Sequence, residues 1–224
     1  MGEMMDAIAH QWKQPISVLQ MQIQMLKFDF DDGKIHNNYI TKFENDMQKQ
    51  IDHMVSTLDE FRKFFRPDTK VEKFNVNQMI EKVLHLMKDE LTSNQINTKI
   101  NSNDILELYG NENEIIHIIL NIINNAKDAF NEKKIKNRQI EISLNNFDEI
   151  KKIEIEDNAG GIPLEIIDNI FKANFTTKKD IGGTGIGLYM SSQIAEKNHG
   201  VLSVENVKNG VRFSLEIKDI GINI

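Results

Sequence analysis

The stretch Asp157-Asn158-Ala159-Gly160-Gly161-Ile162 follows a run of alternating apolar and polar residues and precedes Pro163. The alternation predicts a strand over residues 152–156, and the fixed φ of proline suits the first turn of a helix. An aspartate at a strand end, beside glycines without side chains, forms a slot for a flat ring with a fixed hydrogen-bond acceptor. Such a carboxylate accepts from the 6-amino group of adenine but faces the carbonyl oxygen of guanine. The stretch therefore favours ATP over GTP, with an ordinary tight turn as the alternative.

A second glycine-rich stretch, Gly182–Leu188, opens a predicted helix that ends near Asn198. Glycines let the backbone approach phosphates closely, and the free N–H groups at a helix start point toward negative charge. We therefore expect a triphosphate ligand. The run lacks the lysine–serine pair of a P-loop, and no strand immediately precedes it as in a dinucleotide fingerprint. A flexible loop of the same composition is the alternative.

The third polar element is Asn121–Ala129, within a helix predicted over residues 111–130. Asn121, Asn125 and Asp128 are spaced by four and three residues, so they share one face of that helix, while isoleucines occupy the others. Mg²⁺ prefers oxygen ligands and keeps several waters, so one carboxamide oxygen with the triphosphate oxygens suffices. The alternative is a solvated face, although asparagine is a poor helix former.

The region after Pro67 mixes helices and strands, which segregate into an α+β layered domain. Besides the elements above, the periodicities predict a helix over 77–91, a strand over 96–100, a strand over 139–144 that forms a hairpin with 152–156, and a last hairpin of 201–207 with 211–217.

Before Pro67, apolar residues at spacings of three and four predict two long amphipathic helices, over Ile16–Phe30 and Ile40–Phe65. The turn Asp31–Lys34 contains Gly33 as a C-cap, so the helices are expected to form an antiparallel hairpin. We expect a helical hairpin over 1–66, a linker over 67–70 and a second domain over 71–224.

Two helices alone cannot enclose a core, and the first helix bears a second apolar stripe at Val18, Met21, Met25 and Phe28. Two hairpins could pair into a four-helix bundle, so we expect a homodimer. The alternative is that the second stripe docks on the C-terminal domain.

Composition excludes several classes of function. The chain has 224 residues, no cysteine and a formal net charge of −7, so disulfides, thiolate metal sites and a cysteine nucleophile are excluded and nucleic acid is not an expected partner. The longest apolar stretch, Ile115–Ile123, is too short to cross a bilayer. We expect a cytoplasmic chain without membrane contact, although a longer native form could be attached to a membrane.

In order and spacing, these stretches resemble the sequence boxes of the sensor histidine kinases of two-component systems. Asn121–Ala126 resembles the N box, Asp157–Ile162 the first glycine box, Ile170–Lys178 the F box and Gly183–Leu188 the second glycine box. The resemblance implies a protein-histidine kinase whose second domain is a Bergerat-type α/β sandwich that binds ATP and Mg²⁺.

The resemblance also implies roles by position. Asn125 would ligate Mg²⁺, Asp157 would bind adenine above Gly161, and Phe175 would anchor a mobile lid. Lys178 would reach a phosphate, with a solvated lysine as the alternative. The other expected nucleotide contacts are Asn121, Asp128, Gly183, Thr184, Gly185, Gly187 and Leu188.

The stretch Ala9–Pro15 resembles the H box, in which a histidine precedes a proline by five residues. The family pattern implies that His10 takes the γ-phosphoryl group and passes it to an aspartate of a response regulator receiver domain. A neutral imidazole is a competent nucleophile near neutral pH. Without the boxes downstream, His10 would be interpreted as an ordinary surface residue.

The H box departs from the family at Gln11, where most members carry a glutamate or aspartate. A carboxamide cannot take a proton, so we expect Gln11 to fix the imidazole tautomer while the proton leaves to water or to Asp6. Gln14 stands where many relatives carry the residue that positions water for dephosphorylation of the regulator, which implies phosphatase activity. Two alternatives remain: a Bergerat-type ATPase that clamps a partner, and a non-catalytic ATP-binding dimerisation module.

Overall fold

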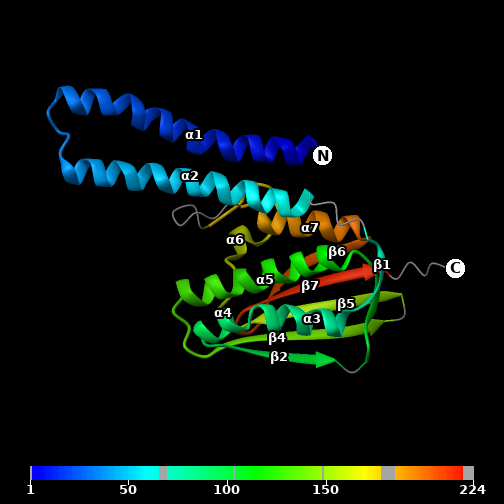
Figure 1. The fold of residues 1–224 in the computed structure, drawn as a ribbon. Coiled ribbons are helices and arrows are strands. Elements are labelled where there is room, and N and C mark those ends of the chain that lie inside the picture. The colour runs from blue at the N-terminus through cyan, green and yellow to red at the C-terminus, as the bar shows by residue number, and fades with distance from the viewer. Residues whose placement is uncertain (1, 66–69, 103, 148, 178–184, 219–224) are drawn as a thin grey trace. The chain divides into compact units, whose positions relative to one another are not determined.

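The computed structural model describes residues 2–65, 70–102, 104–147, 149–177 and 185–218, with the side chains of residues 2–11, 14, 53 and 56–65 left undescribed (Figure 1). The chain divides into two compact units. One comprises Met1–Arg66 with Lys172–Gly187, and the other Pro67–Phe171 with Leu188–Ile224. Each unit is described by itself.

The first unit contains the predicted helical hairpin. Helix α1 (Gly2–Asp31) and helix α2 (Asn37–Phe65) lie side by side and run in opposite directions (Figure 1). Gly33 has φ +66°, as a C-cap glycine requires, and the hydroxyl of Tyr39 donates to the Asp29 carboxylate at 2.7 Å. Helix α1 continues through Pro15, which is buried. The prediction of a hairpin is confirmed.

The second unit is built on a mixed sheet of five strands in the order β2-β4-β5-β7-β6. Strand β2 pairs in parallel with β4, and the other neighbours are antiparallel. The strands are β2 (Ile96–Ser102), β4 (Arg138–Phe147), β5 (Ile150–Asp157), β6 (Gly200–Asn206) and β7 (Val211–Lys218). Both predicted hairpins, β4 with β5 and β6 with β7, are confirmed.

The short strands β1 (Glu72–Asn75) and β3 (Glu107–Gly110) form a separate antiparallel pair that the sequence analysis did not predict. Each has only four residues, and only β3 alternates exposed and buried positions. Their pairing joins segments more than 30 residues apart, and this contact leaves no local pattern in the sequence.

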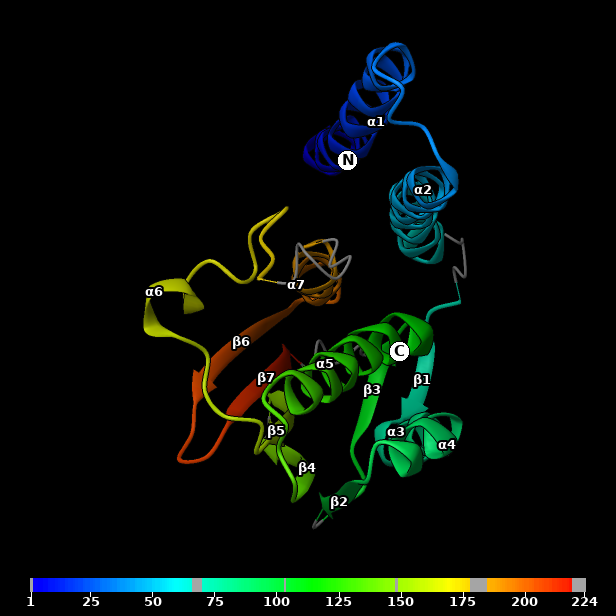
Figure 2. The same cartoon turned by 90° about the vertical axis from the view of Figure 1, so that its left-hand side faces the viewer.

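Helices α3 (Val76–Leu86), α5 (Glu112–Glu132) and α7 (Gly187–Lys197) cover one face of the five-stranded sheet (Figure 2). The prediction of one helix over 77–91 is wrong, because the chain turns at Met87 and continues as α4 (Lys88–Ser93). Met87 and Leu91 are both buried, so apolar periodicity runs across the break and hides it. Helix α6 (Leu164–Ile167) begins just after Pro163, its N-cap residue.

The core lies between α5 and the sheet. Every second residue of β4 and β5 is buried, and α5 packs its isoleucine face against these strands. Burial of each such side chain contributes about 1.5–3 kcal/mol. The most deeply buried include Ile115, Ile118, Ile119, Ile123, Phe130, Ile140, Ile142, Ile153 and Ile155. Within the described part of the chain, no helix has the length and apolarity needed to span a membrane.

Candidate functional site

Asp157 is the last residue of β5, and its side chain lies on the buried, helix-covered side of the sheet with only 7% of the residue exposed. One carboxylate oxygen accepts from the backbone N–H of Ala159 at 2.8 Å. Burial raises the pKa of Asp157 above its usual value, while the Ala159 N–H and the charge of Lys133 act in the opposite direction. The predicted acceptor is therefore a desolvated carboxyl that polar contacts hold in one orientation.

The glycine loop after Asp157 is fixed by side chains from distant segments. The Asn158 carboxamide accepts from the Gln139 N–H at 2.8 Å and donates to the Asn137 carbonyl at 2.7 Å. Asn206, at the end of β6, accepts from the N–H of Ile162 at 2.7 Å and donates to its carbonyl at 2.8 Å. These bonds define the loop conformation without any ligand.

Two glycines beside Asp157 have a steric requirement. A Cβ atom on Gly161 would lie 2.9 Å from the Asn206 side-chain oxygen, and one on Gly210 would lie 1.8 Å from the Asp157 carbonyl oxygen. Gly210 lies between the two strands of the predicted hairpin over 201–207 and 211–217. Its contact with Asp157 appears once β7 pairs with β5.

Helix α5 presents the predicted polar face. Asn121, Asn125 and Asp128 are half-buried, whereas Ile118 and Ile122 are buried. The Asn121 amide donates to the hydroxyl of Ser191 on α7 at 2.9 Å, so this side chain has a partner within the protein. The Asn125 carboxamide makes no hydrogen bond to any residue in the described part of the chain. Its oxygen is therefore available to a cation, which fits the expected Mg²⁺.

The remaining predicted nucleotide contacts fall in several places. Leu188 lies in the first turn of α7, half-buried. Phe175 and Gly185 belong to the first unit, and Gly185 has φ +65° with its Cβ position 2.9 Å from the Phe175 carbonyl oxygen. The F-box and second glycine stretches are thus in close contact. Gly187 begins α7.

Some predicted residues are not described. Lys178, Gly183 and Thr184 lie outside the described residues. His10, Gln11 and Gln14 belong to α1, but their side chains lie outside the description. Their expected roles stay predictions.

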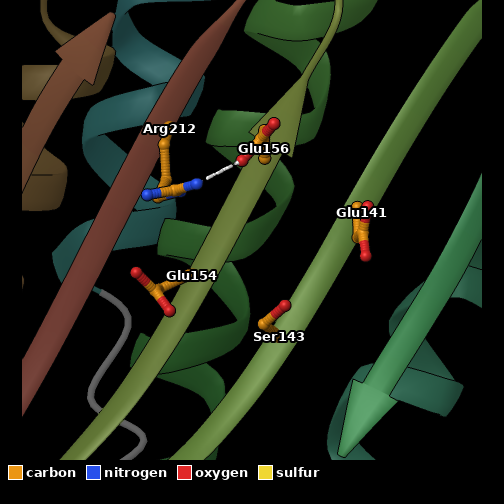
Figure 3. A pocket seen from close by; sticks show the side chains of 5 residues that line it. All are labelled: Glu141, Ser143, Glu154, Glu156 and Arg212. Carbon is orange, nitrogen blue, oxygen red and sulfur yellow. Dashed lines mark hydrogen bonds and ion pairs between the residues drawn. The ribbon is translucent and has the colours of Figure 1, made fainter. Parts of the chain in front are cut away.

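The outer face of the sheet carries a polar hollow of about 360 Å³ lined by Glu141, Ser143, Glu154, Glu156 and Arg212 (Figure 3). These residues alternate with the buried ones along their strands, so the hollow is on the face opposite Asp157. Its carboxylates are already paired. Arg212 donates to Glu156 at 2.7 Å, Asn145 donates to Glu154 at 3.0 Å, and Lys99 lies 3.5 Å from Glu141.

Comparison with known proteins identifies the domain. Residues 110–220 match the family described as histidine kinase-, DNA gyrase B- and HSP90-like ATPase. The chain is 27% identical over 96% of its length to the signal transduction histidine-protein kinase AtoS of Escherichia coli (strain K12), covering 34% of that protein. The chain spans about half the length, or less, of the curated relatives it matches.

Solved structures agree with this assignment. The catalytic domain of histidine kinase ThkA matches with a TM-score of 0.60 and 28% identity, over 67% of this chain and 98% of that domain. ThkA in complex with the response regulator protein TrrA matches with a TM-score of 0.63 and 24% identity, over 97% of this chain and 61% of that chain. The second unit therefore carries the ATPase fold of histidine kinases, and the chain is homologous to a two-component histidine kinase catalytic core.

Proposed function

We propose that this chain is the catalytic core of a histidine autokinase, which binds ATP with Mg²⁺ and phosphorylates His10. The observation that carries the proposal is the buried Asp157 carboxyl at the end of β5, beside a glycine loop that Asn158 and Asn206 hold in place. In this arrangement Asp157 accepts from the adenine amino group, with Gly161 below the ring. The carboxamide oxygen of Asn125 is the proposed protein ligand of Mg²⁺.

In the proposed reaction, an imidazole nitrogen of His10 attacks the γ-phosphorus of ATP. The N–P bond forms as the bond from the γ-phosphorus to the β,γ-bridging oxygen breaks, and ADP leaves with that electron pair. The imidazole proton passes to water or to Asp6. Such a transfer depends on positioning and charge compensation more than on covalent help. Mg²⁺, when bound, supplies part of that compensation, and Lys178 is the proposed cation from the protein.

The second proposed step passes the phosphoryl group to an aspartate of a response regulator receiver domain. Homology to sensor histidine kinases supports this partner, as does the complex of ThkA with a response regulator. Gln14 is proposed to orient water for a separate reaction, hydrolysis of the aspartyl phosphate, which dephosphorylates the regulator. Gln14→Ala should abolish regulator dephosphorylation and leave phosphorylation of His10 intact.

The hairpin is the proposed dimerisation unit, over residues 1–66. Helix α1 exposes large apolar side chains along both of its predicted stripes, among them Met21, Ile23, Met25, Phe28 and Phe30. Four-helix bundles bury such faces by pairing two hairpins. A second copy of this chain is therefore the proposed partner.

Incubation with γ-labelled ATP and Mg²⁺ tests the kinase activity. The expected result is a label on the protein that is labile in acid, stable in alkali and absent in His10→Ala. His85→Ala removes an exposed histidine of α3 and is the matched control, which should label normally. Nucleotide binding without any label would instead favour the non-catalytic module, whose main support is Gln11.

A further inference from the structure

Lys133 connects the end of α5 to the glycine loop. It is the C-cap residue of α5, and its ammonium donates to two consecutive carbonyls, that of Gly160 at 3.1 Å and that of Gly161 at 3.0 Å. The sequence analysis assigned no role to this lysine. The residue as a whole is exposed to solvent, yet its ammonium is held at the loop that follows Asp157.

We infer that Lys133 is a positioning residue of the nucleotide site, whose ammonium holds the Gly160–Gly161 backbone in place beside Asp157. This inference rests on the proposed function. Lys133 would act on the nucleotide only through Asp157 and the loop, so it is not proposed to touch the ligand.

The local geometry supports a specific contact. A Cβ atom on Gly160 would lie 3.3 Å from the lysine nitrogen, closer than ordinary packing, and Gly160 has φ +81°. A glycine at this position therefore leaves room for the ammonium and adopts the left-handed backbone that turns both carbonyls toward it. A lysine with two charge-assisted bonds to one loop has given up much of its rotational freedom.

The Lys133 ammonium is one of several groups that affect the pKa of Asp157. Lys133, from the α5–β4 connection, is the cation that lowers the pKa of Asp157, together with the N–H groups of Ala159 and Val211. Burial and the charge of Glu156 act in the opposite direction. Glu156 lies on the other face of β5, where Arg212 pairs with it at 2.7 Å. Removal of the Lys133 charge therefore leaves Asp157 buried without its main opposing cation, and its pKa should rise further.

The sign of the pH effect follows directly. Protonated Asp157 has lost the charged acceptor that the adenine amino group needs, so affinity falls as the pH drops through the pKa of Asp157. In Lys133→Met, the pH range over which nucleotide affinity falls should move to higher pH. If Lys133 only stabilised the fold, its substitution would change stability but would leave the pH at which nucleotide affinity falls unchanged.

The experiment compares Lys133→Met, Lys133→Arg and Lys136→Met, the last being an exposed lysine of the same connection that serves as the control. The first readout is the ¹³C NMR titration of the Asp157 carboxyl without nucleotide, assigned with Asp157→Asn. The second is calorimetric binding of ADP with Mg²⁺ as a function of pH. In Lys133→Met we expect a higher titration midpoint for Asp157 and about three- to tenfold weaker ADP binding near neutral pH, as for loss of a charged hydrogen bond. Lys133→Arg should bring the Asp157 titration midpoint and the ADP affinity most of the way back to their native values. Lys136→Met should have the native midpoint and the native affinity.

An unchanged Asp157 titration in folded Lys133→Met would overturn the inference, and Lys133→Gln provides the same test if the methionine variant fails to fold. A native chain that does not bind ADP would contradict the proposed function instead. The titration without nucleotide would still decide whether Lys133 lowers the pKa of Asp157, so the two failures are distinguishable.

Discussion

Asp157 combines a proposed role in adenine binding with an unfavourable effect on stability. Its pKa is raised by burial in the folded chain, so the folded state binds more protons than the unfolded state between the two pKa values. The contribution of Asp157 to the free energy of unfolding therefore falls as the pH rises through the folded-state pKa. Burial therefore disfavours the ionised carboxylate, and the Ala159 N–H and the charge of Lys133 offset this effect only in part.

Asp157→Asn should consequently separate binding from stability. The asparagine oxygen can still accept from the Ala159 N–H, but it no longer has a charge to desolvate. We expect a higher melting temperature at neutral pH and about 10- to 100-fold weaker ADP binding, as for loss of a charged acceptor. Calorimetric binding and thermal unfolding measure both effects. Lower stability at neutral pH together with native affinity would contradict this account of Asp157.

Gly210 should tolerate no side chain. A Cβ atom at this position would lie 1.8 Å from the Asp157 carbonyl oxygen, and the neighbouring atoms belong to backbone, which cannot give way cheaply. We expect Gly210→Ala to lower the free energy of unfolding by about 2–4 kcal/mol in urea denaturation.

The control for this prediction is Gly110→Ala in the same unit. Its Cβ would meet only the end of the Asn198 side chain at 3.1 Å, which can shift. Equal effects of the two substitutions would show that the close approach at Asp157 is not what constrains Gly210.

At the residue scale, the sequence predicted those parts of the site whose pattern is local. The Asp157–Ile162 stretch and the polar face of α5 could be found because each lies within one element or turn. Lys133, Asn206 and Gly210 could not, since they reach the loop only after β4, β5, β6 and β7 are paired in the sheet. A contact between distant segments leaves no periodicity in either of them.

Among the elements, α5 carries two asparagines with different contacts. Asn121 donates to Ser191, which is only 2% exposed, and so joins α5 to α7. Asn125, one turn later, has no hydrogen-bond partner among the described residues. The resemblance assigned both residues to the nucleotide, whereas their contacts differ.

Alanine substitutions should separate these two positions. Asn121→Ala leaves the buried Ser191 hydroxyl without this partner, so we expect a loss of about 1–2 kcal/mol in the free energy of unfolding. Asn125→Ala should change that free energy by less than about 0.5 kcal/mol and weaken ADP binding about tenfold or more in the presence of Mg²⁺ only. Urea denaturation and calorimetry with and without Mg²⁺ measure these quantities. A Mg²⁺-independent defect in Asn125→Ala would argue against its role as a metal ligand.

The elements themselves were predictable where periodicity was long and uninterrupted. The hairpin helices, α5 and the β4–β5 hairpin follow from spacing alone. The turn at Met87 was not predictable, because both of the helices that it joins bury apolar side chains on a continuous pattern.

For the whole molecule, the relevant feature is the exposed apolar surface of the hairpin. Phe28 is 71% exposed and Phe30 is 70% exposed, although both belong to an amphipathic helix. A second hairpin would bury these side chains in a four-helix bundle. The proposed assembly is therefore a homodimer.

Phe28→Glu should weaken that dimer. A charge at this position would be desolvated in the bundle, so we expect the native chain to have twice the 25.9 kDa mass of one chain in light scattering and the variant to shift toward the monomer. Lys27→Ala, which alters the neighbouring exposed residue, should remain dimeric. A monomeric native chain at micromolar concentration would contradict the proposed bundle.

In the proposed function, a purine nucleotide binds with its adenine against Asp157. The most direct measurement is calorimetric titration of the native chain with ATP and, separately, with GTP, each with Mg²⁺. The account predicts one ATP bound per chain and at least about tenfold weaker binding of GTP, whose carbonyl oxygen would face the Asp157 carboxylate. No ATP binding, or equal affinity for the two nucleotides, would contradict it.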